Sequence, residues 1–359
     1  MVDRSRRDFL KIAVAGIATM ALGSLAGCLT RREELVICNW SYYINETLLD
    51  VFSSHIGVPR DAIIYEEYED PNYVLTKLEA GVSGYDVIIL PDYCVDIARK
   101  KNLLLELDKK LIPNSRYLDE KFLNLPYDPE GKFSIVYMWG STGFAWRSGI
   151  EDVTTLEQIF NPEYGFLPKY RKKITMLEEA TEVICSCKAY LGKKMDDWSD
   201  ETLEEVKDVL IKQKPYLASY AGANIYYEGL KSGAIYVAQA YNGDIARLRE
   251  EFSEVYFGVP EEGGTIWTDN FCIPKDAKNV KAAHEFINFM LDPEIAAANS
   301  KLIRYANPVK ASWDLLGELL EDPIVYPPEE VQKKMWLMPS LSEEERRKIE
   351  RLMLEVKAL

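Results

Sequence analysis

Early in the chain, short apolar runs alternate with amphipathic segments. Residues 34–40 (ELVICNW) and 62–68 (AIIYEEY) are rich in β-branched and aromatic side chains, and residues 85–90 (YDVIIL) form a continuous apolar run. Residues 45–57 and 71–81, between these runs, space their apolar positions three or four apart and end at a glycine. The pattern predicts strand, helix, strand, helix and strand, which is typical of a parallel sheet with helices on both faces.

A second region repeats this alternation after a glycine-interrupted apolar run at residues 133–149. The predicted strands cover residues 172–177, 234–241 and 255–260, and the predicted helices cover residues 155–160, 178–192, 200–214 and 244–252. Residues 270–302 then predict a strand and a helix that return to the first region.

The length of the chain favours two domains. With 359 residues it exceeds the size of one hydrophobic core, so two domains of about 150 residues are expected. The predicted division assigns residues 35–141 and 269–312 to one lobe and residues 142–268 and 313–359 to the other. When the chain passes between two α/β domains more than once, the crossings form a hinge with a cleft between the domains. Closure of this hinge over a ligand is the function that such an arrangement supports most directly.

The N-terminal segment differs from the rest of the chain. Arg6 and Arg7 precede an apolar run that is shorter than the roughly 20 residues of a membrane-spanning helix. The sequence LAGC at the end of this run resembles a bacterial lipobox. We therefore predict a twin-arginine signal at residues 1–27, cleavage before Cys28 with lipid on its sulfur, and a linker at residues 28–34. An uncleaved membrane anchor is the alternative.

Composition and charge describe an acidic globular protein. Apolar residues make up 47% of the chain and charged residues 28%, a mixture typical of a globular fold, and the net charge is −15. Removal of residues 1–27, which contain four basic and two acidic residues, would change this charge to −17. Such a surface repels nucleic acid and anionic lipid and favours cations, so no nucleic-acid partner is expected.

The cysteines and histidines show no metal-site pattern. Five cysteines follow Cys28 at scattered positions in apolar runs, and an odd number argues against a complete disulfide framework. Cys185 and Cys187 form a CSC triplet, but no second cluster accompanies it and the chain has only two histidines. We expect buried free thiols, no metal and no cofactor.

Aromatic and acidic residues alternate at the predicted ends of strands, where ligands gather in open α/β sheets. The set comprises Trp40, Ser41, Tyr43, Asp92, Tyr93, Glu179, Glu182, Tyr241, Asp244, Trp267, Asp269 and Tyr305. Carboxylates accept charge-assisted hydrogen bonds from ammonium groups, and aromatic faces attract cations. The set predicts a slot for an amine, although each residue alone also fits an ordinary core or surface position.

The stretch EEGGTIWTDNFCIP at residues 261–274 concentrates this chemistry. Its glycines predict a turn into a strand that crosses between the lobes. Trp267 and Asp269 are two residues apart and therefore lie on the same side of an extended chain. One face thus offers an apolar wall for a methylene chain and an anion for its terminal nitrogen.

Seven segments, in a fixed order, resemble the spermidine/putrescine-binding proteins that serve ABC transporters. They are VICNWSYYINETLLDVF, GYDVIILPDYCVDIARKKNLL, LPYDPEGKFSIVYMWGSTGFAW, YNGDIA, GGTIWTDNFCIPKDAKN, AAHEFINFMLDPEIAA and RYANP. The resemblance covers nearly the whole chain after Cys28. It implies a type II two-lobed periplasmic-binding-protein fold of the α/β class, with a membrane permease and its ATPase as partners.

The resemblance extends to site residues of the first lobe. Trp40, Ser41 and Tyr43 match the family's N-W-[ST]-x-Y segment. Tyr93 matches an aromatic residue that lines the family's slot. Pro91 departs from the pattern, because the family commonly has serine there, so one side-chain hydrogen bond is expected to be absent.

The remaining matches belong to the second lobe and the returning segment. Glu179 and Glu182 match a pair of acids on the second lobe. Trp267 and Asp269 match a W-x-D pair in which the acid holds an amino group and the indole packs on the methylene chain. Tyr305 matches a tyrosine on the returning segment.

We predict an exported monomer, periplasmic or on the outer face of the cytoplasmic membrane, that captures spermidine or putrescine for an ABC importer by hinge closure and has no enzymatic activity. The preference between the two polyamines stays open. Asp244 resembles putrescine-preferring members, whereas Glu179 with Glu182 resembles spermidine-preferring members. Tyr241 departs from the family pattern, because a tryptophan is frequent at that position. The alternatives are a binding protein for another organic cation, or a secreted glycoside hydrolase, because paired carboxylates among aromatics also serve that chemistry.

Overall fold

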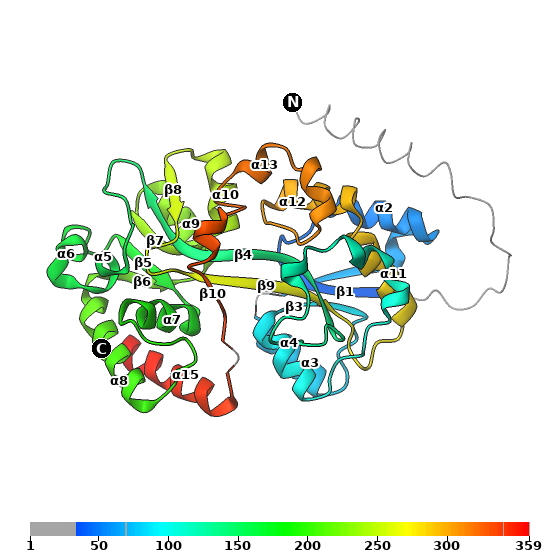
Figure 1. Ribbon diagram of the computed structural model, residues 1–359, viewed down its shortest axis with the longest axis horizontal. Helices are drawn as coiled ribbons and strands as arrows, with labels where there is room; N and C mark the ends of the chain where they lie inside the picture. Colours follow the sequence, from blue (N-terminus) through cyan, green and yellow to red (C-terminus); the bar gives the residue numbers. More distant parts are fainter. Residues whose placement is uncertain (1–33, 69, 340, 359) are drawn as a thin grey trace.

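The structure of the protein, a computed structural model, describes residues 34–68, 70–339 and 341–358. The predicted signal, Cys28 and nearly all of the predicted linker lie outside these residues. Figure 1 shows two lobes side by side, joined by two long strands. Among the described residues, no helix has both the length and the apolar character that crossing a bilayer requires.

The first lobe, blue and cyan in Figure 1, follows the predicted alternation of strands and helices. Its elements are β1 (Leu35–Trp40), α2 (Thr47–Ile56), β2 (Ile63–Tyr68), α3 (Pro71–Glu79), β3 (Val87–Pro91) and α4 (Asp92–Lys100), joined by α11 (Val280–Met290) and α12 (Pro293–Ile303). β1 pairs in parallel with β2 and with β3, which confirms the predicted parallel sheet. Asp70 caps α3, which Pro71 opens, and Gly57 ends α2 in the left-handed conformation.

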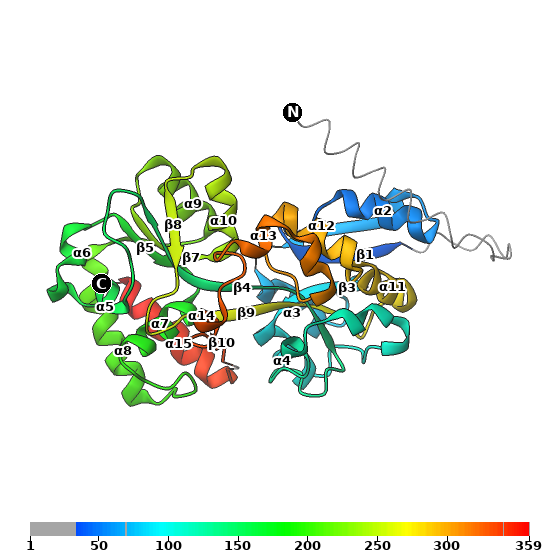
Figure 2. The same cartoon turned by 45° about the horizontal axis from the view of Figure 1, so that its top comes forward.

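Two long strands connect the lobes. β4 (Ser134–Arg147) and β9 (Thr265–Cys272) pair antiparallel with each other, β9 also pairs with β3, and β4 also pairs with β7 (Val237–Tyr241). One sheet, with the strand order β2-β1-β3-β9-β4-β7-β5-β6, therefore continues through both lobes. The predicted strand after the glycines at residues 263–264 is confirmed as β9, and Figure 2 shows it bridging the lobes beside β4.

The second lobe, green in Figure 1, has its own hydrophobic core. Its elements are α5 (Leu156–Phe160), α6 (Phe166–Lys169), β5 (Ile174–Leu177), α7 (Ala180–Tyr190), α8 (Asp200–Gln213), β6 (Leu217–Ala221), α9 (Ala223–Ser232), β7, α10 (Asn242–Glu251) and β8 (Val255–Gly258). The sequence analysis did not predict β6 and α9. β6 gives a weak signal because it is short and its middle residues are partly exposed.

The C-terminal segment passes both lobes before it ends on the second one. Its elements are α13 (Glu318–Glu321), α14 (Glu329–Gln332), β10 (Trp336–Leu337) and α15 (Glu343–Ala358). β10 pairs with the start of β9, and Leu352, Met353 and Val356 of α15 are buried in the core of the second lobe. The boundaries that we assigned between the lobes, at residues 141, 268 and 312, stay a prediction.

Candidate functional site

Four buried acids meet where the lobes join. Asp92, Glu182 and Asp244 lie in the first turns of α4, α7 and α10, each of which follows a strand, and Asp269 lies on β9. A helix N-terminus carries partial positive charge and favours a carboxylate in its first turn. None of the four residues is more than 7% exposed. Burial raises the pKa of Tyr241, and the charges of Glu182, Asp244 and Asp269 raise it further, so the acids of both lobes lie around one ring.

A row of aromatic rings runs through the same region. The ring centroids of Tyr43 and Tyr305 are 5.2 Å apart, those of Tyr305 and Trp267 are 5.6 Å apart, and those of Trp267 and Tyr241 are 6.0 Å apart. The row joins Tyr43, which follows β1, to Tyr241 at the end of β7 in the other lobe. Its faces and edges suit a ligand that combines methylene groups with positive charge.

Two glycines allow these rings to pack directly against the backbone. A Cβ atom on Gly140 would lie 2.4 Å from the Trp267 ring, and a Cβ atom on Gly243 would lie 2.3 Å from the Tyr305 ring. Both distances are far below van der Waals contact, so neither position accommodates a side chain without moving a ring. The sequence analysis did not select Gly243, although it lies within the YNGD segment.

Asp269 connects the end of β1 to β9. Trp40 donates a hydrogen bond from Nε1 to Oδ1 of Asp269 at 3.0 Å. Burial raises the pKa of Asp269 to about 6, against the lowering effect of the Trp40 hydrogen bond. Burial also raises the pKa of Tyr43, and the charge of Asp269 adds to this shift. The structure therefore brings Trp40, Tyr43 and Asp269 together.

Glu182 is held by the two strands that connect the lobes. Thr142 of β4 donates to Oε1 and Thr265 of β9 donates to Oε2, both at 2.7 Å, and the two threonines are register partners. Burial raises the pKa of Glu182 to about 7, although both hydroxyl groups lower it. Sequence reasoning missed Thr142 and Thr265, because single threonines in strands are common and carry no motif.

Asp92 has one carboxylate oxygen without a protein donor. The backbone N–H of Tyr93 donates to Oδ1 at 2.7 Å, whereas Oδ2 is buried and has no hydrogen-bond partner in the described part of the chain. Burial raises the pKa of Asp92 to about 8, and the negative charges of Asp269 and Glu182 contribute. Tyr93 itself is half-buried.

Asp244 differs because the chain supplies its partners. Tyr226 of α9 and Tyr305 donate to its two oxygens, the latter at 3.1 Å, and Arg247 lies 3.3 Å away. Burial still raises the pKa of Asp244, while Tyr226 and Arg247 lower it. Sequence reasoning missed Tyr226, which lies on a helix that it did not predict.

Two predicted residues lie at the margin of this arrangement. Ser41 is half-buried, and its backbone N–H donates to the Tyr68 carbonyl at 3.3 Å. Glu179 is exposed and caps α7 by accepting a hydrogen bond from the Thr181 N–H at 3.2 Å. Burial raises the pKa of Tyr93, and the charge of Glu179 adds to the shift, so Glu179 lies near the site without being buried in it.

The described cysteines take no part in the site. All five are buried and free, with Cys185 and Cys187 in the core of the second lobe. No group of three or more histidines, cysteines or acids in the described ranges is arranged to hold a metal ion. The chemistry available between the lobes is that of carboxylates and aromatic rings.

Comparison with known proteins agrees with this arrangement. Residues 62–327 match the family described as bacterial extracellular solute-binding protein. The chain belongs to this family. This solute-binding protein is 30% identical to the putrescine-binding periplasmic protein SpuD of Pseudomonas aeruginosa strain UCBPP-PA14, over 95% of the chain and 97% of SpuD. It is also 30% identical to the spermidine/putrescine-binding periplasmic protein of Escherichia coli K12, over 88% and 89% of the two chains.

A solved structure extends the likeness to three dimensions. The spermidine/putrescine ABC transporter substrate-binding protein PotD of Streptococcus pneumoniae superposes with a TM-score of 0.80 at 28% identity, covering 91% of this solute-binding protein and 99% of PotD. The comparisons confirm the two-lobed periplasmic-binding-protein fold and the resemblance seen in the sequence motifs. All three relatives are named as binding proteins, and PotD is named as the substrate-binding protein of an ABC transporter.

Proposed function

We propose that this solute-binding protein captures a polyamine, spermidine or putrescine, for an ABC importer. The main support for this proposal is the charge balance of the site. Asp92, Asp269 and Glu182 are buried together, and no basic residue of the described chain forms an ion pair with any of them, in contrast to Asp244. Buried carboxylates without counter-charge are costly. Ammonium groups of a ligand would supply the missing positive charge, and the names of the relatives are those of polyamine-binding proteins.

An extended polyamine would lie along the row of rings. Its methylene groups would contact Trp40, Tyr43, Tyr93, Tyr241, Trp267 and Tyr305, its nitrogens would contact Asp92, Glu179, Glu182, Asp244 and Asp269, and Ser41 would border it. Repulsion among the acids favours an open arrangement of the lobes when no ligand is bound. The ligand's charge removes this repulsion, so it binds the closed form better and shifts the population toward closure.

Titration calorimetry with spermidine and with putrescine tests this function. We expect a dissociation constant of about 1 μM or lower for at least one of them. An uncharged diol with the same chain length as putrescine is the control for apolar contact alone, and we expect no measurable binding of it. Tryptophan fluorescence should change on polyamine binding, because Trp40 and Trp267 lie in the site. Millimolar or absent binding of both polyamines would contradict the proposal.

A thermal-shift panel of amines identifies the preferred ligand. A ligand at 100 times its dissociation constant stabilises the folded state by roughly 2.7 kcal/mol, so the panel ranks ligands by the concentration that each requires. A monoamine that stabilises the protein as strongly as spermidine and putrescine would favour another organic cation as the natural ligand.

We also propose the setting in which capture occurs. The protein would work as a periplasmic monomer at the outer face of the cytoplasmic membrane, with lipid on Cys28 after loss of residues 1–27, and would deliver its ligand to a permease and its ATPase. The names of the relatives support a periplasmic location. The intact mass of the exported protein tests the anchor, and a Cys28→Ser variant that stays on the membrane would contradict it.

A further inference from the structure

Asp92 is one of the most deeply buried carboxyl groups of the protein and has an unsatisfied oxygen. Only 2% of the residue is exposed, and its Oδ2 atom has no hydrogen-bond partner in the described part of the chain. The hydrogen bond to its other oxygen, Oδ1, comes from the backbone N–H of Tyr93 at 2.7 Å. A buried carboxylate oxygen left in this state strongly disfavours the charged form.

The groups that face Asp92 are acidic or neutral. β9 contributes Asp269 and α7 contributes Glu182, both of which raise the pKa of Asp92, after burial, to about 8. Tyr127, in the loop before β4, and Cys94, on α4 itself, are also within electrostatic reach of Asp92. Further out, Glu179, which caps α7, and Arg346 of α15 act with opposite signs on the pKa of Cys94, which burial raises.

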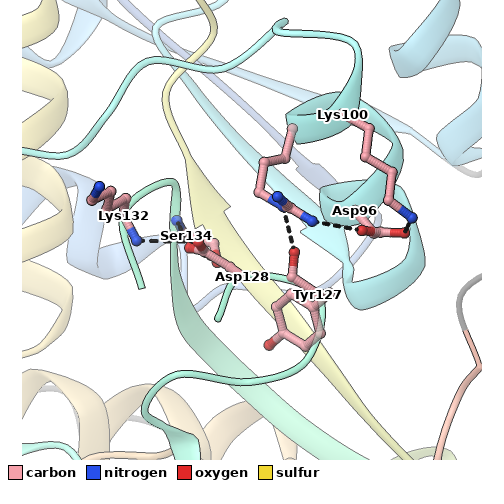
Figure 3. Close-up of polar contacts among 7 residues, drawn as sticks. Asp96, Lys100, Tyr127, Asp128, Lys132 and Ser134 are labelled. Carbon is pink, nitrogen blue, oxygen red and sulfur yellow. Dashed lines mark hydrogen bonds and ion pairs between the residues drawn. The ribbon is translucent and has the colours of Figure 1, made fainter. Parts of the chain in front are cut away.

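Asp96, on the same helix, shows how this chain neutralises a buried acid. Its two oxygens contact Arg99 at 3.0 Å and Lys100 at 2.6 Å. Figure 3 shows Lys100 reaching back to Asp96 from the following turn. Asp92 lies one turn earlier on α4 and has no such partner within the described ranges. The positive charge that Asp92 lacks must therefore come from a proton or from a ligand.

We propose that Asp92 holds a proton when the site has no ligand and exchanges it for an ammonium group of the polyamine. The inference rests on the polyamine binding proposed above. The carboxylic acid loses its proton to solvent, the ammonium group keeps its own protons, and the new carboxylate accepts a hydrogen bond from it at Oδ2. Capture is then coupled to proton release, and affinity rises with pH until Asp92 is ionised in the free protein. Neutral solutes gain nothing from this exchange, which makes Asp92 a residue that selects for cations.

Titration calorimetry in two buffers of different ionisation enthalpy counts the protons. At about pH 7.5, where the ionisation of Asp269 and most of that of Glu182 are complete, we expect spermidine binding to release between about half a proton and one proton. The dissociation constant should fall by about tenfold per pH unit near pH 7.5, fall more steeply below about pH 7 where Glu182 also releases a proton, and level off above about pH 9. Wild-type protein alone gives this result, so the count does not depend on a variant that folds.

Asp92→Asn identifies the source of the proton. The variant should still bind spermidine, but its proton release at about pH 7.5 should fall to that of Glu182 alone, and its pH dependence should flatten. Asp96→Asn is the matched control on the same helix and should release as many protons as the wild type. Binding without proton release, or unchanged release from Asp92→Asn, would overturn this inference and leave the proposed function intact. Absence of polyamine binding in the wild type would overturn both.

Discussion

Helix α4 carries two buried acids, one turn apart, with opposite surroundings. Asp96 is paired with Arg99 and Lys100, whereas Asp92 faces Asp269 and Glu182 and has an oxygen without a donor. The two carboxyl groups share a helix, a lobe and a low exposure, at 3% for Asp96 and 2% for Asp92. The difference therefore comes from what the rest of the fold brings to each side of α4.

The acids around Asp96 have structural partners. Arg99 also donates to the Tyr127 carbonyl at 2.8 Å, and Asp128 accepts hydrogen bonds from the backbone N–H groups of Lys132, Phe133 and Ser134 and from the Ser134 hydroxyl. Figure 3 shows the contact from α4 to the Tyr127 carbonyl and, beside it, Asp128 with Lys132 and Ser134, where the loop leads into β4. Where an acid supports the fold, as Asp96 and Asp128 do, the chain supplies partners for both carboxylate oxygens. Between the lobes, Asp92, Glu182 and Asp269 have no cationic partner within the described ranges, which is the arrangement that a cationic ligand requires.

The largest expected effect is on ligand binding at the acids that have no cationic partner. Asp269→Asn keeps an acceptor for Trp40 Nε1 but removes the charge that a ligand ammonium would contact. We expect affinity for spermidine and putrescine to fall by about 100-fold or more, because a hydrogen-bonded buried charge pair loses one partner. Calorimetry measures the loss. Asp96→Asn makes the same chemical change at a paired acid and should leave the affinity within about twofold. Equal losses in both variants would show that the contrast has no functional meaning.

The next effect is on stability at the satisfied acids. Asp128→Ala removes the acceptor of three backbone N–H groups and one hydroxyl and should lower the free energy of unfolding by about 3 kcal/mol. Denaturant unfolding without ligand measures this change. Polyamine affinity of the folded variant should stay at the wild-type value. An affinity loss comparable to that of Asp269→Asn would mean that the loop before β4 belongs to the binding site.

Sequence reasoning predicted the acids of the site but not which of them are satisfied. The periodicity of β1, β3 and β9 and the order of the motifs were sufficient for the two lobes and for placing Trp40 and Asp269 in one candidate site, but the hydrogen bond between them was not predicted. The tyrosine partners of Asp244 and the threonine partners of Glu182 lie more than ten residues away along the chain. Tyr226 reaches Asp244 because α9 packs beside β7, and Thr142 and Thr265 reach Glu182 because they oppose each other in the sheet. Such pairings depend on strand register and tertiary packing, which no local pattern in this sequence encodes.

A smaller effect is a substitution that should stabilise the unliganded protein, whereas most substitutions of buried residues destabilise it. The pKa of Asp92, at about 8 in the folded state, lies above the value of about 3.9 for an unfolded chain, so its contribution to stability is lost as pH rises from about 4 through 8. Asp92→Asn removes this pH-dependent loss of stability, because asparagine does not ionise. We expect the unliganded variant to be more stable than the wild type by about 1 to 3 kcal/mol at pH 8 and by about a third of that at pH 5.

Asp96→Asn should change stability in the other direction. It weakens the contacts with Arg99 and Lys100 and should destabilise the protein by about 1 kcal/mol at neutral pH. Thermal unfolding of the two variants and the wild type at both pH values measures the difference. Destabilisation by Asp92→Asn at pH 8 would mean that the charged form of Asp92 is favoured by the fold, and the contrast between the two acids would be lost.

The smallest effect tests whether Glu182 behaves as an acid that lacks a cationic partner or as an acid that the chain already satisfies. Each of its oxygens has a threonine donor, yet burial raises its pKa to about 7, so two hydroxyl groups do not replace a cation. Thr142→Val removes one donor and should raise the pKa further, so that Glu182 takes up a proton that the ligand must displace. We expect a two- to fivefold loss of affinity near pH 7, corresponding to about 0.5 to 1 kcal/mol, that shrinks toward pH 9.

Thr175→Val is the matched control for this substitution. Thr175 on β5 is fully buried, and its hydroxyl has no hydrogen-bond partner in the described part of the chain, so its replacement removes a hydroxyl without removing a donor from an acid. Its affinity should match that of the wild type across the same pH range. A pH-independent loss of affinity in Thr142→Val would instead indicate that this threonine only positions β4 against β9. Glu182 would then be a structural acid held by the connecting strands and not an acid that contacts the ligand.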